Sequence, residues 1–374
     1  MSSQFQHPVL PRATHDEASR QEFVRSFKRN LFADVLPGNR LAYDGRVVPQ
    51  FSRDHGRKPH NRHEIRRAML NEPVYQMFSS LKRTQQEMMW AASGETTERC
   101  YETVRTAARK LTAGRTRGSL RLDPKVTIPR YNTLVDIHIQ PGGYHGSDDL
   151  FAGALYDHAV YSYATGTLGP LNDDMGATVI AHLRRTRPDF SPRRILDMGC
   201  AAGHSTLPYV DAFPEAEVHA IDVAAAQLRY AHARAEGLGK RVHFVQQSAE
   251  ATDFDDGFFD LIVSHILFHE TSARAVPKIL RETYRLLAPG GMAVHSEVPG
   301  FHKFRRDPFD QIGAYWEAHY NDEPFMPRLF EMDLVAEAEH AGFRRRNVQD
   351  LLAPSAYRTA MLRGDWYLLE ARKS

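Results

Sequence analysis

The 374-residue chain is poor in cysteine, in long apolar runs and in net charge, and each shortage excludes a class of protein. Its two cysteines, Cys100 and Cys200, are too few and too far apart for a disulfide framework or a cysteine-based metal site. No run approaches the roughly twenty apolar residues that a membrane helix needs, and the first residues lack the apolar centre of a signal peptide. We therefore expect a cytoplasmic protein without a membrane segment.

The charge balance argues against a general nucleic-acid binder. The chain has 48 basic and 46 acidic residues, for a formal net charge of +2. A strongly basic face is the usual signature of nucleic-acid binding. The arginines between Arg53 and Arg67 are interpreted as a solvated surface, with a phosphate-bearing substrate or RNA as the alternative. The hydrophobic content of 42% supports a sizeable core.

The most informative segment runs from Arg194 to His204, where a short apolar strand ends in a turn of small residues. A second strand, Glu217–Val223, places Asp222 nineteen positions after Gly203. An acid at this distance commonly reaches the hydroxyls of a ribose. The turn begins with Asp197, which would repel a phosphate and suits an ammonium group. The two strands therefore predict a nucleoside site on a parallel sheet, and they disfavour a dinucleotide site.

The pattern of an acid followed by alternating small residues resembles the first motif of class I S-adenosylmethionine-dependent methyltransferases, with Ala201 in place of the middle glycine. Residues 244–250 resemble the third strand and adenine loop of that family, and residues 259–264 its fourth strand. Residues 286–291 resemble the turn into its fifth strand. The resemblance covers residues 194–298 and implies an α/β fold with a Rossmann-like seven-stranded sheet, whose last strand, Asp365–Arg372, runs antiparallel. It also implies S-adenosylmethionine as the methyl donor.

The same resemblance implies a set of cofactor contacts. The acid and the glycine turn would hold the methionine end, Asp222 the ribose, and Ser248 with Ala249 the adenine. The expected cofactor-binding residues are Asp197, Gly199, Ala201, Gly203, Asp222, Val223, Ser248, Ala249, Glu250, Ser264 and Tyr156.

The reaction centre is expected directly after the fourth strand, in residues 264–270. A hydroxyl or carbon acid must lose a proton when it is methylated, and histidine is the usual base. The pair His269 and Glu270 resembles the His-acid pair of small-molecule O-methyltransferases, so His269 is predicted to be the general base. Glu270, His265 and Tyr144 are the further catalytic candidates. Alternatively, His265 closes over the cofactor and Glu270 makes an orienting contact.

A metal site is a further alternative, although we assign no metal ligand from the sequence. His265 and His269 are four residues apart, which would place them on one face of a helix. His295 and Glu297 point the same way on the neighbouring strand. Together they make a site of two histidines and one carboxylate geometrically conceivable.

The chain is expected to divide into three parts. Residues 1–60 would form an extended arm or short helices, and residues 61–187 a mainly helical lid or dimerisation region that includes a strand at 133–139 and two helices within 150–186. Residues 188–374 would form the methyltransferase domain, with a cap insertion at 299–328 whose aromatic residues could stack on an acceptor. Tyr144 and Tyr156 are the expected lid contacts.

The predicted function is methyl transfer to a small metabolite, with O-methylation favoured and S-, N- or C-methylation as alternatives. A homodimer is a further expectation. RNA methylation is the runner-up, but residues 263–268 lack the Asn/Asp-Pro-Pro-aromatic signature of base-amino methylation. A catalytically silent partner subunit is a third hypothesis, because Ala201 and Ser248 depart from the family pattern.

Overall fold

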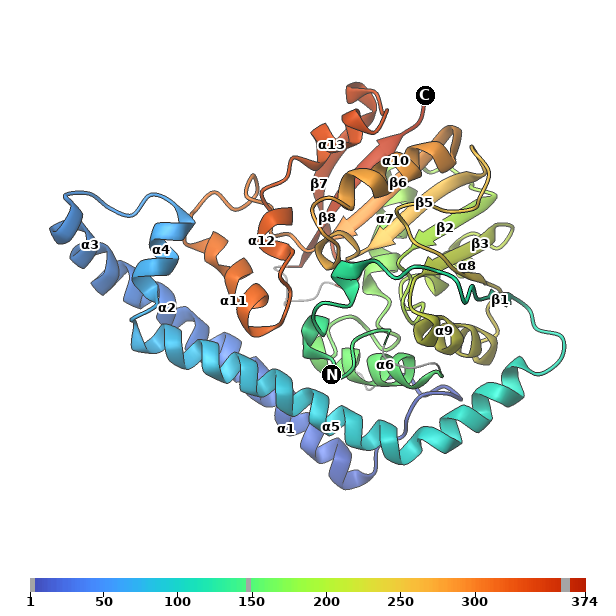
Figure 1. Ribbon diagram of the computed structural model, residues 1–374, viewed down its shortest axis with the longest axis horizontal. Coiled ribbons are helices and arrows are strands. Elements are labelled where there is room, and N and C mark those ends of the chain that lie inside the picture. The colour runs from blue at the N-terminus through green and yellow to red at the C-terminus, as the bar shows by residue number, and fades with distance from the viewer. Residues whose placement is uncertain (1–3, 146–148, 358–363) are drawn as a thin grey trace.

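The computed structural model describes residues 4–145, 149–357 and 364–374, and it shows a twisted sheet beside a long helical arm (Figure 1). The sheet has eight strands in the order β1-β4-β3-β2-β5-β6-β8-β7. Strand β8 runs antiparallel to both of its neighbours, whereas the other paired strands are parallel. The strands are β1 Ser119–Arg121, β2 Arg194–Met198, β3 Glu217–Asp222, β4 His243–Gln246, β5 Phe259–His265, β6 Leu287–Glu297, β7 Val348–Pro354 and β8 Asp365–Arg372.

The predicted fold class is confirmed, and the number of strands is corrected from seven to eight. Strands β2 to β8 form the expected sheet, and β1 is an additional edge strand contributed by the N-terminal extension. Leu120 of β1 lies in register with Phe244 of β4. The short strand therefore joins the extension to the edge of the sheet.

Alternate side chains of the central strands enter two separate cores. Ile195 on β2 packs in the core beneath the helices α7, α8 and α9, whereas its neighbour Leu196 packs in the core beneath α10 and α13. This follows from the two-residue period of a strand. The helices are α7 Asp174–Thr186, α8 Leu207–Ala212, α9 Ala225–Gly237, α10 Val276–Leu286 and α13 Leu334–His340.

Residues 15–55 are helical, so of the two forms considered for residues 1–60 the structure shows short helices and not an extended arm. The helices α1 His15–Asn30, α2 Leu36–Ala42 and α3 Val48–His55 are joined by the π-helical turns η1 Leu31–Val35 and η2 Tyr43–Val47. The side chains of Thr14 and Glu17 form a capping box at the start of α1. Pro37 and Pro49 lie in the first turns of α2 and α3, where the missing N–H of proline is tolerated.

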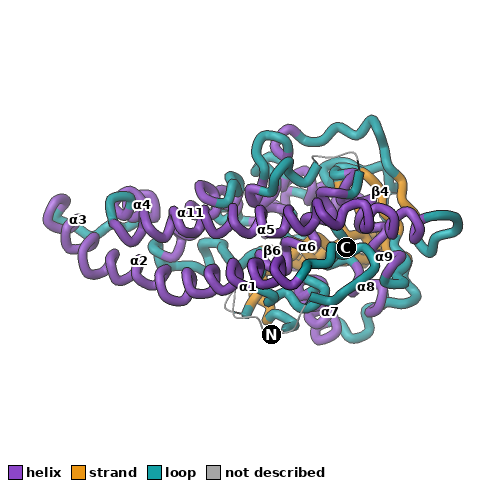
Figure 2. Tube along the Cα trace, turned by 90° about the horizontal axis from the view of Figure 1, so that it is seen from below, coloured by secondary structure: helices purple, strands orange, loops and turns teal. Residues whose placement is uncertain are grey.

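The helix α5, Pro73–Thr112, is the spine of the helical arm. Its 40 residues span about 60 Å at 1.5 Å per residue, and proline occupies its first turn as predicted. Helices α1 and α5 run side by side in both views (Figures 1 and 2). The short helix α4, Arg62–Met69, precedes it, and α6, Phe151–Tyr163, lies between α5 and the sheet. The helical predictions for 61–111 and 150–186 are confirmed.

The predicted strand at 133–139 is wrong. The 3₁₀ turn η3 Arg130–Asn132 precedes the segment, the segment itself contains the 3₁₀ turn η4 Ile137–Ile139, and His138 has a left-handed backbone with φ of 57°. The indole of Trp90 donates a 2.6 Å hydrogen bond to the carbonyl of His138. The tertiary contact with α5 thus outweighs the strand-like alternation of the sequence.

The cap insertion contains η6 Asp310–Ile312, α11 Gly313–Tyr320 and α12 Met326–Leu329. Trp316 of α11 is buried and stacks on Tyr75 of α5, with ring centroids 5.1 Å apart. This aromatic residue therefore fastens the cap to the helical arm, and it is not free to stack on an acceptor. A last turn, η7 Arg345–Asn347, leads into β7. Within the described parts of the chain, no helix is both long and apolar enough to cross a membrane.

Candidate functional site

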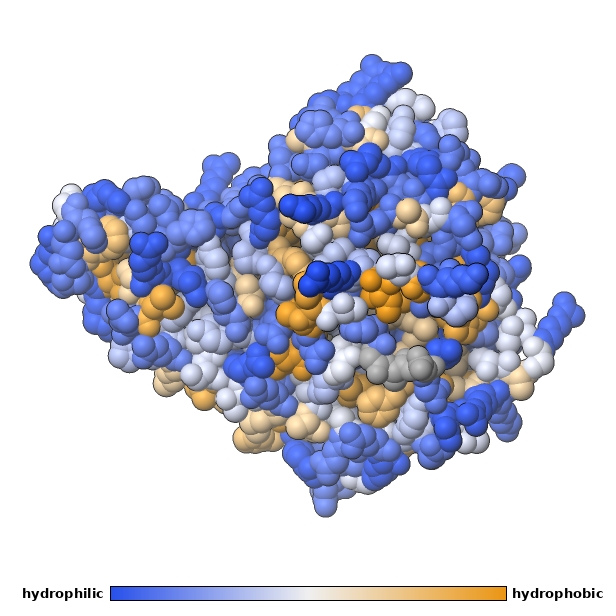
Figure 3. Space-filling model, viewed as in Figure 1, coloured by the Kyte–Doolittle hydropathy of each residue, from blue (hydrophilic) through white to orange (hydrophobic). Residues whose placement is uncertain are grey.

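A pocket opens at the carboxyl ends of the central parallel strands, where open α/β sheets bind ligands. Apolar side chains gather near the centre of this face of the molecule, within a mostly hydrophilic surface (Figure 3). Ten of the residues predicted from the sequence border the pocket: Tyr144, Tyr156, Gly199, Ala201, Asp222, Val223, Ser248, Ala249, His265 and Glu270. The predicted segments thus converge on one cavity, although they lie more than a hundred residues apart in the chain.

The turn after β2 owes its shape to three residues with positive φ. Gly199, Ala201 and Gly203 have φ of 75°, 43° and 76°. Glycine adopts this conformation freely, whereas Ala201 carries a modest strain there. The N–H of Ala201 donates a 2.9 Å hydrogen bond to Asp222, which helps to hold the strained turn against the end of β3.

Asp222 has the position and the free lone pairs that ribose hydroxyls require. One oxygen accepts from Ala201 and the other accepts from the N–H of Ala224 at 2.8 Å. Each carboxylate oxygen retains further acceptor capacity toward the pocket that it borders. Burial raises the pKa of Asp222 above its ordinary value, while the two backbone N–H groups oppose that shift. The residues around this carboxylate fit a ligand that brings hydroxyl donors.

Asp197 lies behind the turn and does not border the pocket. Its carboxylate is 1% exposed, accepts a 2.6 Å hydrogen bond from Thr206 and lies 3.2 Å from Nδ1 of His265. Both oxygens are therefore engaged by protein groups. The structure supports a role for Asp197 in shaping the turn, and a direct contact with a ligand stays a prediction.

Three further predicted contacts are also set back from the pocket. Gly203 closes the turn by donating its N–H to the carbonyl of Cys200. Glu250 accepts a 2.7 Å hydrogen bond from the phenol of Tyr131. Ser264 is buried and lies 2.8 Å from Nδ1 of His295. These side chains support the residues that line the cavity.

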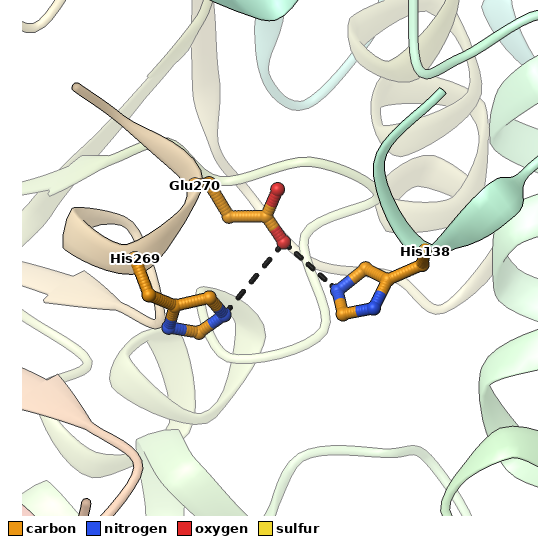
Figure 4. A group of neighbouring side chains, drawn as sticks. All are labelled: His138, His269 and Glu270. Atoms are coloured by element: carbon orange, nitrogen blue, oxygen red, sulfur yellow. Dashed lines mark hydrogen bonds and ion pairs between the residues drawn. The ribbon is translucent and has the colours of Figure 1, made fainter. Parts of the chain in front are cut away.

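His269 and Glu270 lie on η5, Phe268–Glu270, directly after β5 (Figure 4). Glu270 borders the pocket, whereas His269 is buried behind it, with Nε2 3.7 Å from Oε1 of Glu270. Nδ1 of His269 lies 2.6 Å from Glu297. Burial lowers the pKa of this imidazole, but Glu297, Glu270 and Glu323 outweigh burial and raise the pKa of His269 to about 9. At neutral pH it must lose a proton before it can serve as a base.

The metal set considered from the sequence is not brought together. His265 faces Asp197 and the phenol of Tyr209, which lies 3.1 Å from its Nε2. His295 pairs with Ser264, and burial lowers its pKa to about 3. Of His265, His269 and His295, only His269 faces Glu297. The fold therefore distributes these groups over separate contacts.

The extension contributes a histidine that the sequence analysis missed. Nε2 of His138 lies 2.9 Å from Glu270, and its Nδ1 lies 2.9 Å from Glu323 in the cap. Burial lowers the pKa of His138, but the two carboxylates raise it to about 10. A histidine between two isoleucines matches no motif, so its position in the site depends on the tertiary fold.

Tyr144 and Tyr156, the predicted lid contacts, lie next to each other at the pocket. Tyr144 meets Tyr156 edge to face at 5.4 Å between ring centroids, and Tyr156 stacks on His204 at 5.6 Å. Both phenols border the pocket. Gly142 and Gly143, which precede Tyr144, have the positive φ expected of the tight bend.

Residues 195–291 match the family model described as a methyltransferase domain. The chain contains a class I methyltransferase domain. The sheet order and the antiparallel β8 have the topology expected for this domain.

Curated relatives share the methyltransferase domain. The demethylmenaquinone methyltransferase of Thermus thermophilus is 38% identical over 109 residues, which are 29% of this chain and 49% of that protein. The malonyl-[acyl-carrier protein] O-methyltransferase of Halorhodospira halophila is 36% identical over 153 residues, or 41% of this chain and 48% of that protein. The chain thus spans about half the length of these relatives. An O-methyltransferase family protein from Burkholderia thailandensis aligns with a TM-score of 0.43 at 16% identity, covering 61% of each chain.

Proposed function

We propose that this protein transfers a methyl group from S-adenosylmethionine to a small-molecule acceptor, with a hydroxyl oxygen as the favoured acceptor atom. The observation that carries the proposal is the pocket itself, where Asp222 and the turn of Gly199 and Ala201 meet Glu270. A ribose-binding carboxylate and a proton-accepting or orienting group thereby share one cavity. The methyltransferase relatives support the same reaction class.

The donor supplies a sulfonium methyl group: its carbon–sulfur bond breaks with both electrons staying on sulfur, while a carbon–oxygen bond forms and the acceptor hydroxyl loses its proton. The protein must hold the two reactants in line and keep water out. Asp222 would hold the ribose, the turn at Gly199 the methionine end, and Ser248 with Ala249 the adenine. Tyr144 and Tyr156 would close the pocket. His269 is the hypothesised acceptor of the proton, with Glu297 orienting its ring.

The contacts of the arginine-rich segment support a small acceptor over RNA. Arg57 pairs with Glu64 at 2.8 Å, and Arg62 pairs with Glu331, just after the cap insertion. These two guanidinium groups are engaged within the protein. A phosphate backbone needs a row of free cations, since each neutralised phosphate contributes to binding.

Substituting Asp222 by Ala is expected to raise the Kd for S-adenosylmethionine at least about tenfold, because hydrogen bonds to a charged group each contribute about 1.5–3 kcal/mol. Calorimetric titration of the purified protein measures the change. Asp222→Asn is the second variant, since it preserves the shape of the side chain and, with one remaining oxygen acceptor, should bind more weakly than the wild type.

Asp211→Ala is the matched control, because that carboxylate is exposed and pairs with Lys240 on the surface. Its affinity should equal that of the wild type. Absence of binding to the folded wild-type protein, or equal affinity of wild type and Asp222→Ala, contradicts the proposed cofactor site. Binding without turnover on panels of hydroxyl, thiol and amine acceptors favours the silent-subunit hypothesis.

A further inference from the structure

His138, His269 and Glu270 point toward one another beside the pocket (Figure 4). His138 comes from the N-terminal extension, whereas His269 and Glu270 come from the loop after β5 of the methyltransferase domain. One ligand atom from each residue lies within 4.8 Å of the other two. The extension and the domain thus build this cluster together.

The spacing of the three groups suits ligands of a single ion. Two ligand atoms that each lie about 2.1 Å from an ion are about 3.0 Å apart at a right angle and about 3.4 Å apart at the tetrahedral angle. Nε2 of His138 lies 2.9 Å from Oε1 of Glu270, and Nε2 of His269 lies 3.7 Å from the same oxygen. These two distances bracket the spacings expected of ligands around one centre.

Each imidazole is oriented by a second, buried carboxylate. Nδ1 of His269 lies 2.6 Å from Glu297, and Nδ1 of His138 lies 2.9 Å from Glu323. Histidines that bind metals almost always donate their other N–H to such a partner, which fixes the tautomer and leaves the remaining nitrogen free to coordinate. In both histidines the other ring nitrogen, Nε2, faces Oε1 of Glu270.

Carboxyl groups outnumber imidazoles in this cluster. Glu270, Glu297 and Glu323 surround the two imidazoles of His138 and His269. Oε2 of Glu270 and Oε2 of Glu323 are buried and have no hydrogen-bond partner among the described residues. The other oxygen of each group is engaged by protein donors, so one buried oxygen on each carboxyl group is left for a further donor or a cation.

The backbone of His138 is held in an uncommon conformation at this point. Its φ of 57° lies in the left-handed region, and its carbonyl accepts hydrogen bonds from Trp90 at 2.6 Å and from Gln86 at 3.3 Å. A strained backbone conformation persists only where the surrounding contacts hold it in place. Such residues are concentrated at functional sites. The long helix α5 therefore holds the loop that carries the His138 imidazole against the methyltransferase domain.

We infer that His138, His269 and Glu270 form a binding site for a divalent first-row transition-metal ion, an inference that rests on the proposed function. Two imidazoles and one carboxylate favour Fe²⁺, Co²⁺ or Zn²⁺ over Mg²⁺ and Ca²⁺, which prefer oxygen ligands. Three protein ligands leave coordination positions open, and Glu270 borders the pocket.

The site narrows the class of acceptor to molecules with an oxygen donor, and it favours a hydroxyl beside a second oxygen that can chelate the ion. The ion would bind the hydroxyl oxygen and ease loss of its proton, which passes to the free Oε2 of Glu270. The oxygen then attacks the donor's methyl carbon, and the carbon–sulfur bond breaks with its electrons on sulfur. In this assignment His269 is a ligand, and it no longer serves as the base.

The test is titration of the chelator-treated full-length protein with Co²⁺ alone, followed by visible absorption and calorimetry, with S-adenosylmethionine titrated into the same preparation. We expect equimolar Co²⁺ binding. His138→Gln should weaken it by at least about tenfold, and Glu323→Gln by about ten- to a hundredfold through loss of the orienting carboxylate. His182→Gln is the matched control, because His182 is a buried histidine paired with Glu370 at 2.7 Å, outside the cluster. Its Co²⁺ affinity should equal that of the wild type.

The two proposals fail in distinguishable ways. Folded wild-type protein that binds S-adenosylmethionine but takes up no stoichiometric Co²⁺ overturns the metal site and leaves the proposed function standing. Protein that binds Co²⁺ but not S-adenosylmethionine overturns the proposed function and leaves the ligand assignment standing. Equal Co²⁺ affinity of the wild type and His138→Gln, with far-ultraviolet circular dichroism showing both folded, overturns the assignment of His138.

Discussion

Substituting His269 by Ala is expected to lower the turnover number by about 10²- to 10⁴-fold, the usual contribution of a general acid or base. The affinity for S-adenosylmethionine should stay unchanged, because His269 lies behind Glu270 and does not border the pocket. The loss of turnover is expected whether this imidazole accepts the acceptor's proton or binds an ion. Release of S-adenosylhomocysteine with an active acceptor measures turnover, and calorimetry measures donor binding.

The variant Glu323→Gln separates the two roles of His269. Glu323 faces His138, and its charge also helps to raise the pKa of His269. A base at His269 therefore predicts that the pH–rate profile shifts to lower pH and that added metal has no effect, whereas a metal site predicts a large fall in turnover that added Co²⁺ partly restores. His182→Gln serves as the control for loss of a buried histidine. Turnover of His269→Ala close to that of the wild type would exclude both roles.

Substituting Asp157 by Asn is expected to lower the free energy of unfolding by about 3–5 kcal/mol, the usual cost of breaking a buried charge pair. The carboxylate of Asp157 is 1% exposed and lies at the centre of a buried polar network. Its partners come from the N-terminal segment, the glycine turn and α9, and they are His7 at 3.0 Å, His204 at 2.7 Å, Tyr230 at 2.8 Å and Arg234 at 3.1 Å. The amide removes the negative charge that Arg234 faces.

Denaturant unfolding near neutral pH measures this loss, with Asp44→Asn as the control. Asp44 pairs with Arg40 at 2.8 Å on the surface, where an ion pair contributes about 0–1 kcal/mol. A loss for Asp157→Asn as small as that of the control would contradict a central role for this network.

The stability provided by Asp157 should also depend on pH in a defined direction. Burial raises the pKa of its carboxyl, but Arg234 and the hydrogen-bonded His204 and His7 outweigh burial and hold that pKa well below the ordinary value. A depressed pKa in the folded state stabilises the protein above the unfolded pKa of about 3.9, and this stability is lost as the pH falls below it. The difference in unfolding free energy between wild type and Asp157→Asn should therefore narrow as the pH is lowered toward about 3.

Much of the sheet was predictable because its strands are short apolar runs bounded by glycine turns. The terminal strand was predicted at Asp365–Arg372 and forms over the same residues, antiparallel as the family resemblance implied. Asp222 was predicted from its distance to the glycine turn, and it borders the pocket. Local chemistry and spacing suffice for such features, because strand, turn and carboxylate lie within thirty residues of one another.

The extension was harder to predict because its structure depends on contacts with distant parts of the chain. Residues 133–139 alternate like a strand, yet the hydrogen bonds from Trp90 and Gln86 hold His138 in a left-handed turn. Prolines and arginines in the first sixty residues obscured three helices, of which α1 and α2 pack against α5.

The sequence by itself determined the class of fold, the glycine turn and the acid, Asp222, that borders the pocket as the candidate ribose contact, since these depend on residues close together in the chain. Only the tertiary structure decided that Asp197 faces the protein and that Trp316 fastens the cap to the arm. It also decided that His138 completes a cluster with His269 and Glu270. The physical reason is that burial, ion pairing and a strained backbone are set by contacts between different elements of the fold, and no local sequence pattern records such contacts.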